Sequence, residues 1–171
     1  MEAVADIHDA AVLERLRARG ADLGLVYGSP ILKPELFETP AFGTIGIHHG
    51  SLPEYRGKKT TFWAMFNGEV VAGVTIQRIG RGIDTGEIVS TAEVPTAGKW
   101  YGQVNAELER VGVRLYLAAV LAVKRGQARC RPQAARSSGL YRQPGTQDIV
   151  RLWWRQLTAG HGSARPVKRV P

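Results

Sequence analysis

Gly43-Thr-Ile-Gly-Ile-His-His-Gly-Ser-Leu-Pro-Glu-Tyr-Arg-Gly57 is the stretch of this 171-residue chain that decides its fold. The residues from Gly43 to Ile47 form a short apolar run, which predicts a buried strand. The strand runs into a loop, because Gly50 and Pro53 interrupt regular structure. In α/β sheets, ligands bind in crevices at the carboxyl ends of strands. The loop that begins at His48 is therefore the first candidate for a functional site.

A second loop follows a second predicted strand, which covers residues 70–79. This loop reads Arg81-Gly-Ile-Asp-Thr-Gly86 and leads into a further predicted strand over 87–94. If the two loops meet at the edge of the sheet, Asp84 can hold the His48 imidazole in one tautomer and stabilise its cationic form. The spacing alone leaves open that His48 and Asp84 are unconnected loop residues.

The neighbouring histidines His48 and His49 also raise the question of a metal site. Adjacent side chains of an extended segment point in opposite directions. No third ligand lies near them in the sequence. We therefore expect no metal.

The apolar pattern predicts three helices, over residues 10–19, about 60–66 and about 100–124. Asp9 and Gly20 suit the two ends of the first helix, and Thr60 or Thr61 can cap the second. One buried stripe is expected on the long helix, formed by Val104, Leu108, Val111, Leu115 and Ala118 or Ala119.

The order of elements predicts a mixed sheet. The run over residues 22–27 is a short buried strand, and the strand–helix–strand order at the start implies a parallel unit. The short loop between 70–79 and 87–94 favours an antiparallel pair.

The C-terminal part has a weaker pattern. Thr146 can cap a short helix that holds Ile149, Leu152 and Trp153. At most one of the adjacent Trp153 and Trp154 can face inward. We expect a folded domain over residues 1–157 and a disordered basic tail over residues 158–171, because the tail has too few apolar residues to pack.

The charge is unevenly placed. Residues 124–171 hold eleven Lys or Arg and one acid, Asp148, whereas the net charge of the chain is +8. This asymmetry fits an anionic partner such as tRNA or a nucleotide-linked sugar, or a basic tail that is merely solvated. The basic loop residues Arg56, Lys58 and Lys59 either bind a phosphate or are merely solvated.

The remaining composition bears on the cellular setting. The single cysteine, Cys130, and an acidic N-terminal stretch without a secretory pattern favour a cytoplasmic protein. No apolar run approaches the roughly 20 residues of a membrane-spanning helix, so we expect no membrane partner.

Several collinear motifs between Gly43 and Val89 resemble the folate-dependent formyltransferase family, which includes the methionyl-tRNA, glycinamide ribonucleotide and sugar-nucleotide formyltransferases. Those enzymes carry Asn-x-His at the end of a strand, a loop ending Leu-Pro-x-Tyr/Phe-Arg/Lys-Gly, an Asn-Gly-Glu turn, a Thr-Gly-Val-Thr strand and an x-Asp-Thr-Gly-x-Ile loop. The corresponding segments here are Gly46-Ile-His48, Leu52-Pro-Glu-Tyr-Arg-Gly57, Asn67-Gly-Glu69, Ala72-Gly-Val-Thr75 and Ile83-Asp-Thr-Gly-Glu-Ile88. A looser resemblance extends from about Asp22 to Gln133.

The resemblance implies a Rossmann-like formyltransferase fold with a mixed, mainly parallel sheet. It also implies transfer of a formyl group from 10-formyltetrahydrofolate to a primary amine of an amino sugar, another small amine or methionyl-tRNA. His48 would donate to the oxyanion or assist proton transfer, and Asp84 would orient His48 and help take up the amine proton. The implied folate pocket has an apolar side and a main-chain edge, formed by Pro30, Ile31, Leu32 and Phe37 and by Ile79 to Ile83, including Gly82.

The chain departs from the family in three ways. The catalytic Asn of the family falls on Gly46, and His49 is a candidate substitute donor. The first strand–loop–helix unit of the family is lacking, so an exposed sheet edge is expected to favour a homo-oligomer. The resemblance does not extend to the C-terminal domain of the tRNA-specific enzymes, so we expect tRNA to be a less favoured acceptor. Two alternatives stay open: a weak or inactive relative, and a hydrolase that releases formate from the folate.

Overall fold

The structure is a computed structural model that describes residues 3–134 and 139–158. Of the expected tail over residues 158–171, Thr158 is the last residue of a helix and the rest lies outside the described residues, so the division into domain and tail stays a prediction. Five helices and six strands are present in the described ranges, in the order α1 (Ala10–Arg19), β1 (Gly24–Val26), α2 (Pro34–Phe37), β2 (Thr44–His48), β3 (Arg56–Gly57), α3 (Thr60–Phe66), β4 (Val71–Arg78), β5 (Ile88–Pro95), α4 (Tyr101–Lys124), β6 (Leu140–Tyr141) and α5 (Thr146–Thr158).

The expected mixed α/β architecture is confirmed. The main sheet has the strand order β1-β2-β4-β5, and β3 pairs with β6 in a small second sheet. The β1–β2 and β3–β6 pairs are parallel, whereas β2–β4 and β4–β5 are antiparallel. The described strand pairs are thus half parallel and half antiparallel. The β4–β5 pair is antiparallel because the short connection between these strands returns the chain in the opposite direction.

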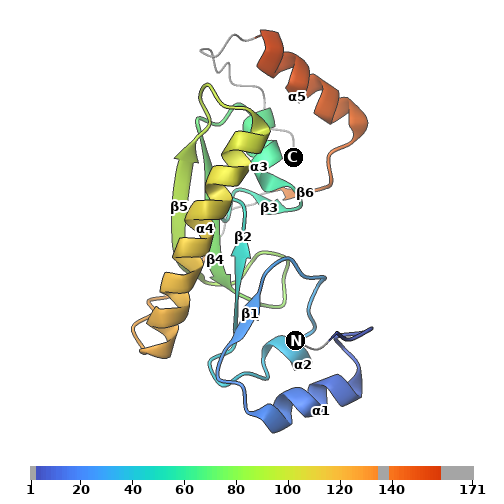
Figure 1. Ribbon diagram of the computed structural model, residues 1–171, viewed down its shortest axis with the longest axis vertical. Helices are drawn as coiled ribbons and strands as arrows, with labels where there is room; N and C mark the ends of the chain where they lie inside the picture. The colour runs from blue at the N-terminus through green and yellow to red at the C-terminus, as the bar shows by residue number, and fades with distance from the viewer. Residues whose placement is uncertain (1–2, 135–138, 159–171) are drawn as a thin grey trace.

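The long helix α4 covers one face of the main sheet (Figure 1). Val104 and Leu108 are fully buried on it, and Ala119 is also buried, as the expected stripe requires. Gly112 lies on the same stripe, where an added Cβ would come within 2.8 Å of Ile47 Cδ1. Glycine at this position therefore allows the helix to approach the sheet closely.

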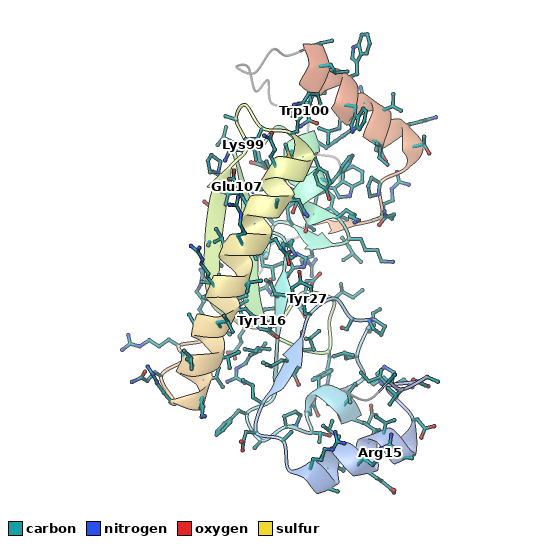
Figure 2. All side chains as sticks on the ribbon, viewed as in Figure 1. Arg15, Tyr27, Lys99, Trp100, Glu107 and Tyr116 are labelled. Carbon is teal, nitrogen blue, oxygen red and sulfur yellow. The ribbon has the colours of Figure 1, made fainter. Side chains whose placement is uncertain are left out.

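Tyr116 joins α4 to the edge of the sheet. Its hydroxyl accepts from the backbone N–H of Val26 at 2.8 Å and donates to the carbonyl of Ile45 at 2.9 Å. Figure 2 shows Tyr116 and Tyr27 at this junction between α4 and β1. Leu25 on β1 and Tyr27, which follows this strand, are exposed, so one side of the edge strand is uncovered within the described residues.

The ends of the helices test the expected caps. Asp9 accepts from the N–H of Ala11 at 2.8 Å, and Gly20 ends α1 with φ +59°, as expected. The expected cap of α3 was wrong, because this helix begins after Lys59 without a side-chain cap. The hydroxyl of Thr60 donates instead to the carbonyl of His49, so it fixes the loop that follows β2.

The C-terminal helix α5 packs through one buried residue, Leu152. Trp153 and Trp154 are both exposed, although the sequence allowed one of them to face inward. None of the described helices has the length and apolar content that would let it cross a membrane.

The buried stripe of α4 generates a stability prediction. Leu108→Ala is expected to lower the free energy of unfolding by about 2–5 kcal/mol, because Leu108 is 0% exposed and truncation leaves a cavity. The control is Leu117→Ala on the same helix, where the leucine is 61% exposed and the loss should stay within about 0.5 kcal/mol. Chemical denaturation of the two variants measures the difference, and equal losses would contradict the packing of α4.

Candidate active site

His48 is the last residue of β2, and alternation along this strand decides what its side chain faces. Ile45 and Ile47 pack into the core on the α4 side of the sheet. Gly46 and His48 belong to the opposite face, where their partners on β4 are Gln77 and Thr75. The strand therefore supplies the core with one face and the candidate site with the other.

Asp84 reaches His48 by a route that the sequence did not predict. Because β2 and β4 are antiparallel, their carboxyl ends lie at opposite ends of the sheet. The loop after β2 and the loop after β4 therefore start at opposite ends as well. The loop after β4 instead folds back, so that His48 Nδ1 lies 3.3 Å from Asp84 Oδ1. Glycine is required in this loop at position 86, where a Cβ would collide with the carbonyl of Arg78.

The His48 ring has an acceptor at each nitrogen. Its Nε2 lies 2.7 Å from the carbonyl oxygen of Tyr55, and its Nδ1 faces Asp84. A carbonyl accepts and does not donate, so Nε2 carries a proton in this arrangement. A second proton on Nδ1 satisfies the carboxylate as well. Both ring nitrogens of this side chain, which is 9% exposed, therefore face acceptors.

The carboxylate of Asp84 is fixed by donors from two other segments. Its Oδ2 accepts from the backbone N–H of Gly57 at 2.8 Å, and its Oδ1 accepts from Gln77 Nε2 at 2.8 Å. Gln133 Nε2 donates to the carbonyls of Asp84 and Gly86 at 3.0 and 2.7 Å, which holds the loop in place. These contacts stabilise a partly buried charge that would otherwise be costly.

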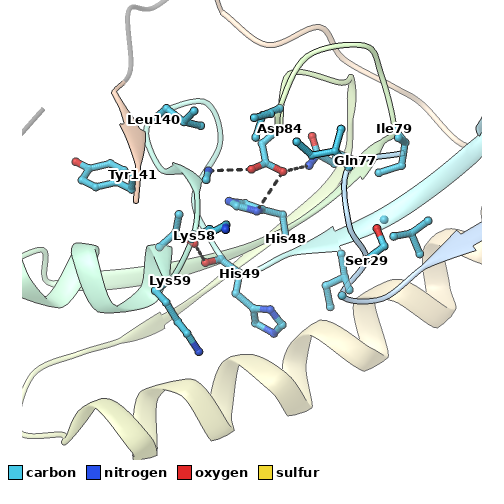
Figure 3. A pocket seen from close by; sticks show the side chains of 18 of the residues that line it. Ser29, His48, His49, Lys58, Lys59, Gln77, Ile79, Asp84, Leu140 and Tyr141 are labelled. Carbon is cyan, nitrogen blue, oxygen red and sulfur yellow. Dashed lines mark hydrogen bonds and ion pairs between the residues drawn. The ribbon is translucent and has the colours of Figure 1, made fainter. Parts of the chain in front are cut away.

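A cleft of about 810 Å³ opens beside this pair. Figure 3 shows Asp84 and His48 in contact at its centre, with Leu140, Tyr141, Lys58 and Lys59 on one side and Ser29 and Ile79 on the other. Six of the expected folate residues line the cleft, namely Pro30, Ile31, Leu32, Ile79, Gly82 and Ile83. Phe37 does not, because α2 turns its side chain into the protein interior, where it is 4% exposed.

His49 points toward α4, away from the His48–Asp84 pair (Figure 3). Its Nε2 lies 2.9 Å from Glu109 Oε2, and the hydroxyl of Tyr27 donates to the other oxygen of the same carboxylate. Burial lowers the pKa of His49, and the nearby Glu109 carboxylate opposes that shift. The expectation that His49 replaces the missing amide donor is therefore not supported by its orientation.

Gly46 occupies the position of the family's Asn, and the space beside it is filled. A Cβ at this position would lie 2.8 Å from Ile79 Cδ1 and 3.6 Å from the carbonyl oxygen of Val26. A longer side chain there requires Ile79 to change its rotamer. Among the described residues, no group of three His, Cys, Asp or Glu side chains gathers that could hold a metal ion.

Sequence reasoning missed Gln77, Gln133 and the carbonyl of Tyr55. Gln77 gave one usable signal, since a long polar side chain inside a buried strand needs a partner. Gln133 lies 49 positions from Asp84, and nothing in its own neighbourhood indicates this contact. A backbone carbonyl leaves no trace in a side-chain pattern.

These features define an α/β domain with a cleft whose His–Asp pair is suited to acid–base chemistry. Residues 3–120 match the family model described as "Formyl transferase". The chain therefore belongs to the formyl transferase family.

Its relatives include two methionyl-tRNA formyltransferases. That of Chloroflexus aggregans is 39% identical over 132 residues, which are 74% of this chain and 42% of the relative. That of Syntrophus aciditrophicus is 35% identical over 167 residues, which are 96% of this chain and 54% of the relative. The chain thus spans about half the length of the curated relatives it matches.

Solved structures share the fold. The formyltransferase PseJ from Anoxybacillus kamchatkensis, solved with UDP-4,6-dideoxy-4-formamido-L-AltNAc and tetrahydrofolate, has a TM-score of 0.70 and 23% identity, over 99% of this chain and 83% of PseJ. Glycinamide ribonucleotide transformylase 1 from Symbiobacterium toebii has a TM-score of 0.65 and 27% identity, over 72% of this chain and 61% of that protein.

The His49–Glu109 pair generates a prediction on pH dependence. Glu109→Gln should lower the pKa of His49 further, because the carboxylate that opposes the effect of burial is lost. An NMR titration of the His49 ring proton measures this shift. Glu107→Gln is the control, since Glu107 lies on the same helix and pairs with Lys99. A His49 pKa that stays constant or rises in Glu109→Gln would contradict the assignment.

The sign of the effect on stability follows from the same shift. The ordinary pKa of an unfolded histidine is about 6.5. Because the folded state holds His49 with a lower pKa, the unfolded chain takes up a proton first as the pH falls below this value. The contribution of His49 to the free energy of unfolding therefore decreases on acidification through this window and is constant above it.

Proposed function

We propose that the chain transfers a formyl group from 10-formyltetrahydrofolate to a primary amine of a small acceptor. The observation that carries this proposal is the 3.3 Å contact between His48 and Asp84 in a cleft that the expected folate residues line. Membership of the formyl transferase family supports the reaction type. The tetrahydrofolate in the PseJ complex supports a folate donor, and the formamido sugar in that complex supports an amino sugar as acceptor.

The reaction needs an oxyanion stabiliser and a proton acceptor. Attack of the amine on the formyl carbon places negative charge on the formyl oxygen and a surplus proton on the nitrogen. The His48 imidazolium supplies positive charge and an N–H for the oxygen. In the present arrangement the Nε2–H of His48 donates to the Tyr55 carbonyl. Donation to the formyl oxygen therefore requires that this N–H be shared with the carbonyl or leave it.

Asp84 has two tasks in this scheme. It would stabilise a cationic ring of His48 through Nδ1, and it is the one carboxylate among the described residues lining the cleft that could take up the proton of the amine. Its bonds to Gly57 and Gln77 fix the carboxylate before the acceptor arrives, so that little reorganisation is needed during the reaction. The departing tetrahydrofolate nitrogen receives a proton in exchange, which restores the starting state.

A weak or inactive relative is the second candidate, and one observation favours it. Position 46 lacks the amide of the family, and Ile79 fills the space where an amide would lie. Loss of one such donor typically costs about 10²- to 10³-fold in rate. A protein with this site would bind the folate and turn it over slowly.

Substitution of the central pair tests the proposed reaction. His48→Asn and Asp84→Asn are each expected to lower amine-dependent formation of tetrahydrofolate by about 10²- to 10⁴-fold. Asp22→Asn is the control, because Asp22 is exposed and does not line the cleft. Circular dichroism checks that all three variants fold.

The same assay separates the alternatives. Formate release without an amine would indicate a hydrolase, and folate binding without turnover would indicate an inactive relative. Turnover that survives both substitutions would exclude His48 and Asp84 as the catalytic residues.

Restoring the amide tests the role of position 46. Gly46→Asn combined with Ile79→Ala, which makes room for the side chain, is expected to raise the rate by about 10²-fold over Ile79→Ala alone, since one oxyanion donor is gained. Single-turnover kinetics measure the change. An unchanged rate would mean that residue 46 does not face the reacting carbonyl.

A further inference from the structure

The apolar side chains of the C-terminal helix α5 face outward. Five of them follow the spacing i, i+1, i+4, i+5 and i+8, which places them on one side of an α-helix. They are between 42% and 67% exposed, and we call them the outer stripe: Ile149, Val150, Trp153, Trp154 and Leu157. Figure 1 shows α5 at the end of the molecule opposite α1. The outer stripe is therefore an apolar ridge at one end of the fold.

Contacts on the inner side of α5 fix this orientation. Arg155 Nη1 donates to the carbonyl of Phe66 at 2.5 Å, and Gln156 Nε2 donates to the carbonyl of Lys99 at 3.3 Å. Leu152 lies on the same side and is 3% exposed. A rotation of the helix that buried the outer stripe would break both hydrogen bonds and expose Leu152. The fold therefore specifies that the stripe points outward.

Positive charge borders the outer stripe. Arg151 is exposed, and its side chain has no ion pair or hydrogen bond in the part of the chain that the structure describes. Burial lowers the pKa of Arg155, and the charge of the nearby Arg151 lowers it further. Asp148 is the one acid of α5, and it lies 4.0 Å from Arg142. Together with the net charge of +8, these features favour an anionic partner.

A second copy of the chain is a poor partner for this ridge. In an antiparallel pair of α5 helices centred on Trp153, Arg151 of one copy would face Arg155 of the other. Like charges at this distance repel each other. The two arginines would therefore oppose the association that the apolar side chains favour.

A lipid surface suits the ridge better than a rigid protein surface does. A protein partner would need a groove of matching shape, whereas a fluid bilayer can close around a protruding helix. Tryptophan rings are enriched at the boundary between lipid headgroups and acyl chains, and two of them are adjacent on the outer stripe. A helix with such an apolar face and arginine beside it has the composition of helices that bind membrane surfaces.

We propose that α5 binds the surface of a bilayer that contains anionic lipids, with the outer stripe among the acyl chains and Arg151 at the lipid phosphates. The inference is independent of the proposed formyl transfer. Helices of this kind lie flat in the interface and bury their apolar face by about 5–10 Å. The contact needs no spanning helix, so it revises the expectation of no membrane partner, which rested on the lack of a spanning run. No cleft-lining residue belongs to α5.

Co-sedimentation of the full chain with vesicles of phosphatidylglycerol and phosphatidylcholine tests the proposal. Trp153→Ser/Trp154→Ser is expected to raise the lipid concentration for half-maximal binding at least about tenfold, because two large apolar side chains no longer enter the bilayer. The matched control is Leu117→Ser/Leu121→Ser on α4, where the leucines are 61% and 51% exposed. Equal binding by the two double variants, or no binding by the unaltered chain, would overturn the proposal.

Fluorescence of the unaltered chain gives a second measurement that needs no variant to fold. Phosphatidylcholine brominated in its acyl chains should quench the tryptophan emission of the bound protein, because Trp153 and Trp154 lie among those chains. Binding without quenching would assign the contact to charge alone and contradict the proposal.

The charge beside the stripe and the competing partner are tested separately. Arg151→Gln should weaken binding to the same vesicles about fivefold, the effect of one cation near an anionic surface, and Arg114→Gln on α4 is its control. Sedimentation velocity without lipid examines self-association. A dimer that Trp153→Ser/Trp154→Ser abolishes would assign the outer stripe to a second copy and overturn the lipid proposal.

Discussion

The contact between the His48 imidazole and the Asp84 carboxylate is the interaction on which the rest of the cleft depends. Antiparallel pairing of β2 and β4 sends the chain away from His48, and the loop must fold back to return Asp84. That return needs a glycine at position 86 and donors from Gly57 and Gln77. Three separate segments therefore converge on one carboxylate. Without the histidine beside it, a partly buried charge would remain with fewer partners, which is costly.

The alternation of β2 ties this site to the hydrophobic core. Ile45 and Ile47 on one face pack into the core on the side of α4, and His48 on the other face reaches the cleft. A shift of the strand by one residue would exchange the two faces and bury the imidazole in the core. Core packing and site geometry are thus specified together, and His49 faces α4 and its Glu109 for the same reason.

The long helices and the strands of the main sheet could be predicted from sequence, since periodicity and turn residues are local signals. The pairing of His48 with Asp84 was left open by spacing and came from the family resemblance. The path of the loop to Asp84 could not be predicted, because it depends on strand pairing that a linear pattern does not record. The contacts of Gln133 and of the Tyr55 carbonyl were missed for a related reason, as they join distant segments or use the backbone. The assignment of Phe37 to the folate pocket came from the family, whereas α2 here directs that side chain inward.

The most direct measurement of the central claim is a crystal structure of the chain with 5-formyltetrahydrofolate, a stable relative of the proposed donor. The account predicts that the pterin lies against the main chain of Ile79 to Ile83, with the reactive end of the folate beside His48 and Asp84. A folate bound outside the cleft would contradict it. So would a complex in which His48 and Asp84 separate and neither faces the ligand.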